Sequence, residues 1–209
     1  MNVVIIDYKS GNLRSAAKAF EKAAGRKGAI KISDDPNDLK KASHIVLPGV
    51  GEFADCMKGI RAVPGLVAEM ETQVLQNKKP FLGICVGMQL LAETGYEHGK
   101  HAGLGWIKGE VKRIEKVTPN MKIPHMGWND LIIKKNHQLV EGIKSGEHAY
   151  FVHSYQFICE DKNDVVAEVE YGGKITAVIA SSNILGAQFH PEKSQETGLK
   201  FIRNFLQIK

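Results

Sequence analysis

The chain carries the stretch PFLGICVGMQLL at residues 80–91, where one cysteine stands between two glycines, after an apolar run and before a helical one. This order is typical of a nucleophile elbow, in which a strand ends, the chain turns sharply and a helix begins beneath the reactive side chain. The turn would force Cys85 into sparsely populated backbone space, and Gly83 and Gly87 would leave room for the close approach. A thiol at a helix N-terminus also favours the thiolate form. Taken alone, the stretch is equally compatible with a buried structural cysteine.

Segments on either side of this stretch alternate between strand and helix patterns, which predicts parallel strands connected by helices on both faces of a sheet. We therefore expect an α/β fold: a flavodoxin-like three-layer sandwich with a mixed, mainly parallel central sheet. Pro48 is expected to stop the third strand, and Pro36 to open a helix. The predicted strands are Val3–Ile6, Ala29–Ile32, His44–Leu47 and Phe81–Ile84, and the predicted helices are Asn12–Ala24, Phe53–Ile60, Leu66–Gln76 and Val86–Thr94.

The second half is richer in strands and ends in an amphipathic helix over Thr197–Leu206. The segment Tyr171–Lys174 reads as a hairpin turn. Since the chain shows neither repeats nor a linker, we expect one domain spanning residues 1–209. The strand candidates are Glu110–Ile114, Asp130–Ile133, Ala149–Val152, Val165–Tyr171, Thr176–Ala180 and Leu185–Phe189.

Composition narrows the function classes. The chain has 209 residues, 43% of them hydrophobic and 24% charged, which is ordinary for a globular protein. Its three cysteines form no CxxC pair, so we expect a reduced, cytoplasmic protein, and no apolar run approaches a membrane span. The net charge of +5 comes from scattered lysines, which favours a solvated surface over a nucleic-acid site. His98 and His101 lack an evident third ligand, so no metal site is predicted.

A second reactive candidate is the segment GAQFHPE at residues 186–192. The apolar run should place His190 at a strand end, the edge where parallel sheets carry their sites. If Pro191 keeps the chain extended, His190 and Glu192 project to the same side. A carboxylate there could orient the imidazole as a base toward a thiol. A surface His-Pro-Glu turn is the simpler alternative for this segment alone, but together with Cys85 it forms a recognised nucleophilic order.

These segments resemble the class I (triad) glutamine amidotransferases, and more finely the glutaminase subunits of imidazole glycerol phosphate synthase. The resemblance covers essentially the whole chain, with small departures at Val86, where Leu is usual, and at Glu52. It rests on GICVGMQ (83–89), FHPE (189–192), PGVG (48–51), PHMGWN (124–129), YFVHSY (150–155), HPEKSQ (190–195), IDY (6–8) and GNL (11–13).

The resemblance implies a role for each matching residue. Cys85 would attack the side-chain amide of L-glutamine to give a thioester and ammonia, with His190 as acid and base and Glu192 orienting it. Backbone N–H groups of Val86 and Val50 would stabilise the oxyanion. The implied glutamine contacts are Gly49, Gly51, Gln89, Ser154 and Tyr155, and the implied partner-face residues are Trp128, Asn129 and Tyr150, although Trp128 by its sequence alone would suit the core.

The resemblance further implies a heterodimer with a (β/α)₈ cyclase subunit of imidazole glycerol phosphate synthase. That subunit would use the ammonia to make imidazole glycerol phosphate and an aminoimidazole ribotide in histidine biosynthesis, with no cofactor on this chain. A paralogous glutaminase that feeds a sugar amidotransferase is a close alternative. A cysteine peptidase, a chaperone-like α/β protein and an inactive scaffold are more distant ones, against which Gln89 and the His190–Glu192 pair argue.

Overall fold

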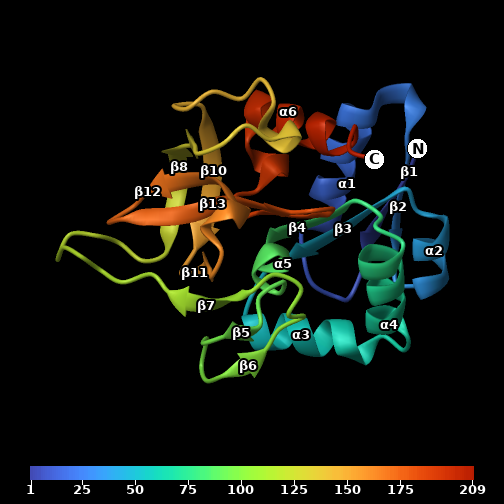
Figure 1. Cartoon of the computed structure of the whole chain (residues 1–209), viewed down its shortest axis with the longest axis horizontal. Helices are drawn as coiled ribbons and strands as arrows, with labels where there is room; N and C mark the ends of the chain where they lie inside the picture. Colours follow the sequence, from blue (N-terminus) through green and yellow to red (C-terminus); the bar gives the residue numbers. More distant parts are fainter.

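An eight-stranded mixed sheet runs through the middle of the molecule (Figure 1), in the order β2-β1-β3-β4-β14-β13-β12-β9. The computed structural model describes residues 1–209, except for the side chain of Lys27. Five neighbouring strands are parallel and the remaining three pair antiparallel, which confirms the predicted fold class. The strands are β1 (Asn2–Ile6), β2 (Ala29–Ser33), β3 (His44–Gly49), β4 (Phe81–Cys85), β9 (Ile132–Ile133), β12 (Val165–Glu170), β13 (Lys174–Ser181) and β14 (Ile184–Ala187).

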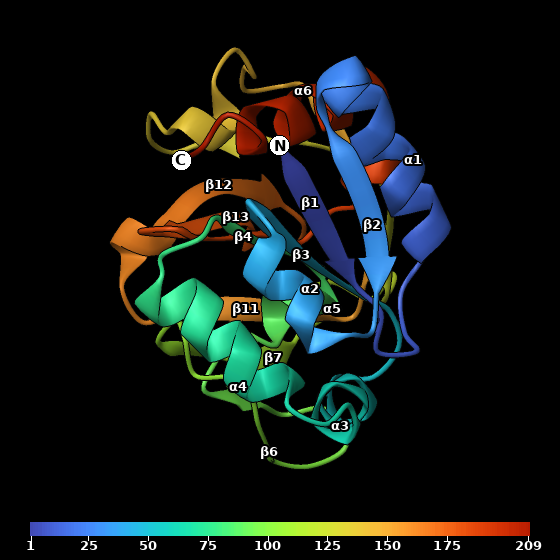
Figure 2. The same cartoon turned by 90° about the vertical axis from the view of Figure 1, so that its right-hand side faces the viewer.

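Helices cover both faces of this sheet (Figure 2), which is why its central strands are apolar throughout. Every residue of β3 and β4 is buried. The helices α1 (Leu13–Ala24) and α6 (Gln195–Phe205) lie on one face, where the rings of Phe20 and Phe205 meet edge to face at 6.2 Å. The other face carries α3 (Phe53–Ala62), α4 (Leu66–Glu71) and the short α5 (Val86–Gln89), with α2 (Pro36–Lys41) beside α4.

Two smaller sheets lie against one end of the large sheet. The first pairs β8 (His125–Asp130) with β10 (His148–His153). The second runs β11-β7-β5-β6, from β11 (Tyr155–Cys159), β7 (Gly109–Arg113), β5 (Thr94–Gly95) and β6 (His101–Ala102). Short turns of 3-10 helix occur at Gly25–Lys27, Gln138–Val140, Lys162–Asp164 and Pro191–Lys193, and a π-helical turn continues α4 over Thr72–Gln76.

The helix predicted over Val86–Thr94 is too long, because α5 ends at Gln89. Beyond Leu90 the N–H groups no longer bond four residues back: those of Leu91 and Ala92 donate three residues back at 3.2 and 3.1 Å, and that of Glu93 donates to the Gly109 carbonyl at 3.1 Å. The carbonyls of residues 90–93 accept from the N–H groups of residues 103–106 at 2.8–3.0 Å, so tertiary hydrogen bonds take the place of a second helical turn. The helix dipole that acts on Cys85 therefore comes from a single turn and is smaller than that of the predicted helix over Val86–Thr94.

Two strand predictions also need correction, and further strands were missed. Pro48 does not stop β3 but lies within it, opposite Ile84 of β4. Pairing with β1 has already ended at Val46, so at Pro48 the strand has only one neighbour and the missing N–H is tolerated. The candidate Asp130–Ile133 is divided between β8 and β9, and β11 was not predicted at all. The other predicted elements, including the hairpin between β12 and β13, are confirmed within a few residues.

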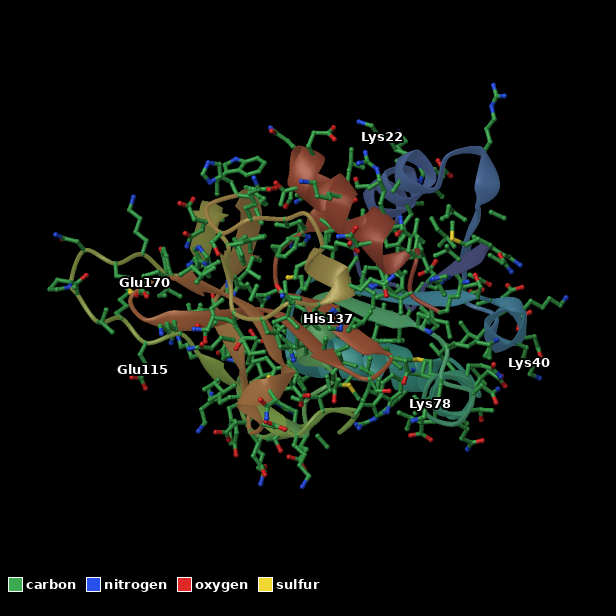
Figure 3. The ribbon with its side chains drawn as sticks, turned by 45° about the horizontal axis from the view of Figure 1, so that its top comes forward. Lys22, Lys40, Lys78, Glu115, His137 and Glu170 are labelled. Atoms are coloured by element: carbon green, nitrogen blue, oxygen red, sulfur yellow. The ribbon has the colours of Figure 1, made fainter. Side chains whose placement is uncertain are left out.

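Charged side chains are spread over the surface. Lys22 lies on α1, while Lys40 and Lys78 lie at the opposite end of the molecule from Glu115 and Glu170 (Figure 3). No helix among the described residues combines the length and the apolar character needed to cross a membrane.

Candidate active site

Cys85 lies at the carboxyl end of β4 in the strained backbone conformation that the sequence predicted, with φ +55° and ψ −115°. The turn brings α5 against β3 and β4 so closely that side chains are excluded. A Cβ on Gly87 would lie 1.8 Å from the carbonyl oxygen of Leu47, and one on Gly83 would lie 2.5 Å from that of Gly87. The elbow geometry is therefore confirmed. It places a 4% exposed Cys85 at the end of the parallel strands.

His190 and Glu192 form a buried pair beside this strand end. Nδ1 of His190 lies 2.8 Å from Oε1 of Glu192, and both side chains are 4% exposed. The contact that the sequence predicted is present, but the reason given for it is wrong. Pro191–Lys193 is a 3-10 turn instead of an extended segment, because proline at the first helical position favours the turn that follows. The backbone N–H of His190 donates to the carbonyl of Tyr150 at 2.9 Å, which ties the pair to β10.

The imidazole of His190 is held in its charged form. Burial by itself lowers the pKa of His190, but interactions with Cys85 and Glu192 outweigh it and raise that pKa to about 10. Nε2 of His190 is buried and, among the described side chains, has no hydrogen-bond partner of normal geometry. One nitrogen is thus fixed by a carboxylate while the other remains available to a reacting group.

The loop after β3 approaches the cysteine from the neighbouring strand, since Gly49 is the register partner of Cys85. Gly51 adopts φ +95°, which a side chain would oppose. The hydroxyl of Ser10 anchors the peptide groups on both sides of Val50. Ser10 Oγ donates to the Val50 carbonyl at 2.7 Å and accepts from the Val50 N–H at 3.4 Å. The thiol of Cys56 also donates to the Val50 carbonyl at 3.4 Å. The Val50 N–H is thus engaged with Ser10.

A cavity of about 330 Å³ lies between these elements. Its lining includes eight of the predicted site residues: Val50, Gly51, Cys85, Val86, Gln89, Ser154, Tyr155 and His190. Two predicted site residues stand behind the wall instead. Gly49 packs on the elbow, where a Cβ would lie 2.6 Å from the Gly87 nitrogen, and Glu192 supports His190.

Several residues at this site were not predicted, and His153 of β10 is one of those that line the cavity. Glu97 lines the cavity and accepts a 2.7 Å hydrogen bond from the Phe53 N–H; it lies in a glycine-rich loop where no periodicity marks it. Lys193 also lines the cavity, with Nζ 5.6 Å from the centre of the Tyr150 ring. Gln188 is fully buried, and its Nε2 lies 3.8 Å from the Cys85 sulfur. An amide within the apolar run Leu185–Phe189 was the available signal for Gln188.

The amide of Gln89 is oriented by buried acceptors. Nε2 of Gln89 donates to the carbonyl of Tyr155 and to Oε1 of Gln188, each at 3.0 Å. Gln188 thereby turns its own Nε2 toward the sulfur of Cys85. The polar wall of the cavity and the nucleophile are therefore parts of one hydrogen-bonded set.

The predicted partner-face residues lie on the small two-stranded sheet. Trp128 of β8 is 49% exposed, so a core position for it is wrong. Its ring meets that of Tyr150 of β10 edge to face, 5.9 Å apart. Asn129 is half-buried, and its amide turns back toward the core.

Comparison with known proteins agrees with this geometry. The family model "Glutamine amidotransferase class-I" matches residues 4–208. Imidazole glycerol phosphate synthase subunit HisH of Rhodospirillum rubrum is 52% identical, over 99% of both chains. The subunit of the same name from Brucella melitensis is 50% identical over the full length of both. The fold is similar to a crystal structure of glutamine amidotransferase (TM-score 0.74, 20% identity, 98% of this chain and 97% of that one). It is also similar to PurLQS from Thermotoga maritima (TM-score 0.70, 23% identity, the same coverage). The chain therefore belongs to the class-I glutamine amidotransferase family.

Proposed function

We propose that the chain, as one domain over residues 1–209, is the glutaminase subunit of imidazole glycerol phosphate synthase. It hydrolyses L-glutamine and passes the ammonia to a cyclase subunit. The observation that carries the proposal is the buried His190–Glu192 pair at 2.8 Å beside the strained Cys85, with Cys85 and His190 lining one cavity and Glu192 behind its wall. Relatives of that name at 50–52% identity over the whole length support the same assignment.

Cys85 is the nucleophile in this proposal. Its thiolate attacks the side-chain carbonyl carbon of glutamine, and the electron pair moves to the oxygen to form a tetrahedral oxyanion. When that intermediate collapses, the C–N bond breaks and the proton on Nε2 of His190 goes to the departing nitrogen as ammonia leaves. A water that is deprotonated by the now neutral His190 then hydrolyses the thioester and releases glutamate. The raised pKa of His190 suits its first role, since the proton is still bound at neutral pH.

The oxyanion requires two donors close to the Cys85 sulfur. We assign the N–H of Val86, which follows the nucleophile, and the N–H of Val50, whose loop lies next to the elbow because Gly49 and Cys85 are register partners. Since the Val50 N–H is engaged with Ser10 at 3.4 Å, the loop must turn before it can donate. We infer that the cyclase and its ligand favour the turned loop, and that the free subunit hydrolyses glutamine slowly.

Glutamine occupies the cavity beside Cys85. Gly51, Gln89, Ser154 and Tyr155 line it and are assigned as substrate contacts. Gly49 is assigned an indirect role, since it lies behind the wall. The mixture of amide, backbone and charged groups around this 330 Å³ space suits a small zwitterionic amino acid.

The partner face is assigned to Trp128, Asn129 and Tyr150 of the small sheet. An exposed aromatic residue beside a second ring is a common anchor of protein interfaces, and Trp128 is 49% exposed with its ring 5.9 Å from that of Tyr150. Ammonia must remain unprotonated to react, which favours direct transfer within a heterodimer. The cysteines Cys56, Cys85 and Cys159 are free and buried, which supports a cytoplasmic setting.

The test is ammonia release from glutamine, measured with and without a (β/α)₈ cyclase and its nucleotide ligand. We expect strong stimulation by the complex, abolition in Cys85→Ala, and labelling of Cys85 by a glutamine-analogue alkylating agent. A rate that is equal in the free subunit and the complex would refute the coupling. Labelling elsewhere than at Cys85 would refute the assignment of the nucleophile.

A further inference from the structure

Two histidines outside the proposed catalytic groups lie in series at the glutamine pocket, with His153 in its lining and His125 behind it. His125 of β8 and His153 of β10 are 2% and 6% exposed, and Nδ1 of His125 lies 2.9 Å from Nε2 of His153. Two imidazoles at this distance share one proton, so one nitrogen donates and the other accepts. The groups at either end of the pair decide which of the two nitrogens donates.

Asn129 fixes the outer end. Its Oδ1 accepts from the N–H of Asp130 at 2.8 Å, and its Nδ2 donates to the carbonyl of Glu170 at 3.0 Å. These backbone partners leave the amide a single orientation, with Nδ2 also 3.1 Å from Nε2 of His125. Nε2 of His125 must therefore accept, and its Nδ1 must carry the proton.

The Tyr155 carbonyl fixes the inner end. It lies 2.8 Å from Nδ1 of His153, and a carbonyl can only accept, so Nδ1 of His153 carries a proton as well. Nε2 of His153 is then the acceptor for His125. Both rings are thus neutral Nδ1–H tautomers, and donation runs in one direction from Asn129 to the Tyr155 carbonyl.

The same carbonyl accepts from Nε2 of Gln89 at 3.0 Å. It joins the histidine pair to Gln89; Gln89, Tyr155 and His153 line the cavity, whereas His125 does not. The His125 ring is also held by stacking, at 4.0 Å from the Tyr171 ring and 4.8 Å from the Phe151 ring. A group so firmly placed can fix the position of what it binds.

We propose that His125 and His153 are positioning residues, which fix the Tyr155 carbonyl and through it the Gln89 amide in the glutamine pocket. This role rests on the proposed glutaminase function. It connects β8, the strand that carries the exposed Trp128, to the substrate through five groups in hydrogen-bond contact: Asn129, His125, His153, the Tyr155 carbonyl and Gln89. Low pKa values, about 4 for His125 and about 3 for His153 because burial disfavours charge, agree with two neutral rings.

The kinetic test compares His153→Phe, which loses the donor to Tyr155, with His153→Asn, whose amide can replace Nδ1. In the complex with the cyclase we expect the KM for glutamine to rise roughly 2- to 12-fold in His153→Phe, as for one lost hydrogen bond, with kcat within about twofold of the wild type. His153→Asn should recover most of the KM. His44→Phe is the matched control: His44 is also 6% exposed, but it bonds Ser43 and the Ile208 carbonyl, away from the pocket, so its loss should lower stability without changing KM.

A double mutant tests the serial arrangement. His125→Phe keeps a ring for stacking but breaks both of its hydrogen bonds, so it should raise KM although it does not line the pocket. His125→Phe combined with His153→Phe should match His153→Phe alone. Independent, multiplying effects would overturn the proposal, as would an unchanged KM in His125→Phe or a KM rise in the His44→Phe control.

Nitrogen-15 NMR of the wild-type imidazoles supplies a readout that is independent of activity and of the folding of any variant. We expect His125 and His153 both as Nδ1–H tautomers at neutral pH. An Nε2–H tautomer or a charged ring at either position would overturn the proposal while leaving the glutaminase assignment intact. A wild-type complex that releases no ammonia from glutamine would instead overturn the proposed function, and the positioning role with it.

Discussion

Replacing Glu192 by glutamine removes one charge and keeps the size and shape of the side chain. The Oε1 of a glutamine can still accept from Nδ1 of His190 across 2.8 Å, in a pocket where both side chains are 4% exposed. Glu192 Oε2 has no hydrogen-bond partner among the described groups, so an amide nitrogen in its place breaks no existing bond. The substitution therefore tests the electrostatic support of His190 without emptying the pocket.

The magnitude follows from the charge that is lost, since the hydrogen bond itself can still form. A hydrogen bond to a charged group contributes about 1.5–3 kcal/mol and a neutral one about 0.5–1.5 kcal/mol, a difference of about 1–1.5 kcal/mol. Since about 1.4 kcal/mol corresponds to one pKa unit, the pKa of His190, raised to about 10 in the native protein, should fall by roughly one unit. Because Cys85 still holds it above its ordinary value, the imidazole remains the acid near neutrality. A step that needs the imidazolium should slow roughly 5- to 12-fold.

The assay is the pH dependence of kcat/KM for glutamine in the complex with the cyclase. Activity requires the proton on His190, so the alkaline limit should move to lower pH in Glu192→Gln. The free energy of unfolding should also depend on the proton at His190. The stabilisation from protonated His190 is complete below about pH 6.5 and is lost as pH rises toward 10. Glu192→Gln should make this stabilisation smaller. Glu196→Gln is the matched control, since the Glu196 side chain is 78% exposed and lies outside the site. A Glu192→Gln profile that superimposes on that of the wild type would refute this account of His190.

Three further variants test other parts of the structure. Gly87→Ala places a Cβ 1.8 Å from the Leu47 carbonyl oxygen, so we expect about 3 kcal/mol less stability in urea denaturation; a loss below about 1 kcal/mol would contradict the elbow packing. Ser10→Ala removes the 2.7 Å bond to the Val50 carbonyl and should raise the glutaminase rate of the free subunit roughly 2- to 12-fold, and a lower rate would argue against the anchored loop. Burial lowers the pKa of the His153 imidazole from 6.5 to about 3. Between pH 6.5 and pH 3 the unfolded chain therefore binds a proton at His153 that the folded chain does not, so the free energy of unfolding should fall as pH drops below 6.5. His153→Phe should flatten this fall in denaturation at pH 7.5 and 5, whereas an equal slope would show that another group is responsible.

Local patterns were sufficient for much of the fold. The apolar run before Cys85 and the flanking glycines predict the strand, the turn and the strain, because all three depend on residues within a few positions of one another. The end of α5 could not be predicted in this way. Past Gln89 the N–H of Glu93 bonds the Gly109 carbonyl and the carbonyls of residues 90–93 bond residues 103–106, which are long-range partners that no local propensity contains. The same holds for Pro48 within β3, which is tolerated because a neighbouring strand ends early.

Patterns along the chain are sufficient to predict the nucleophile elbow and the α/β class, and the two-residue spacing indicates the contact between His190 and Glu192, although not the 3-10 turn that makes it. Which distant groups complete the site depends on tertiary packing. Gln188 faces Cys85, Ser10 holds Val50, and His125 reaches the pocket through His153. These contacts join residues that are 28 to 103 positions apart, and their hydrogen-bond directions are set by partners fixed in other strands. Such directions exist only once the sheets have packed, because only then do the donors and acceptors lose access to water and must satisfy one another.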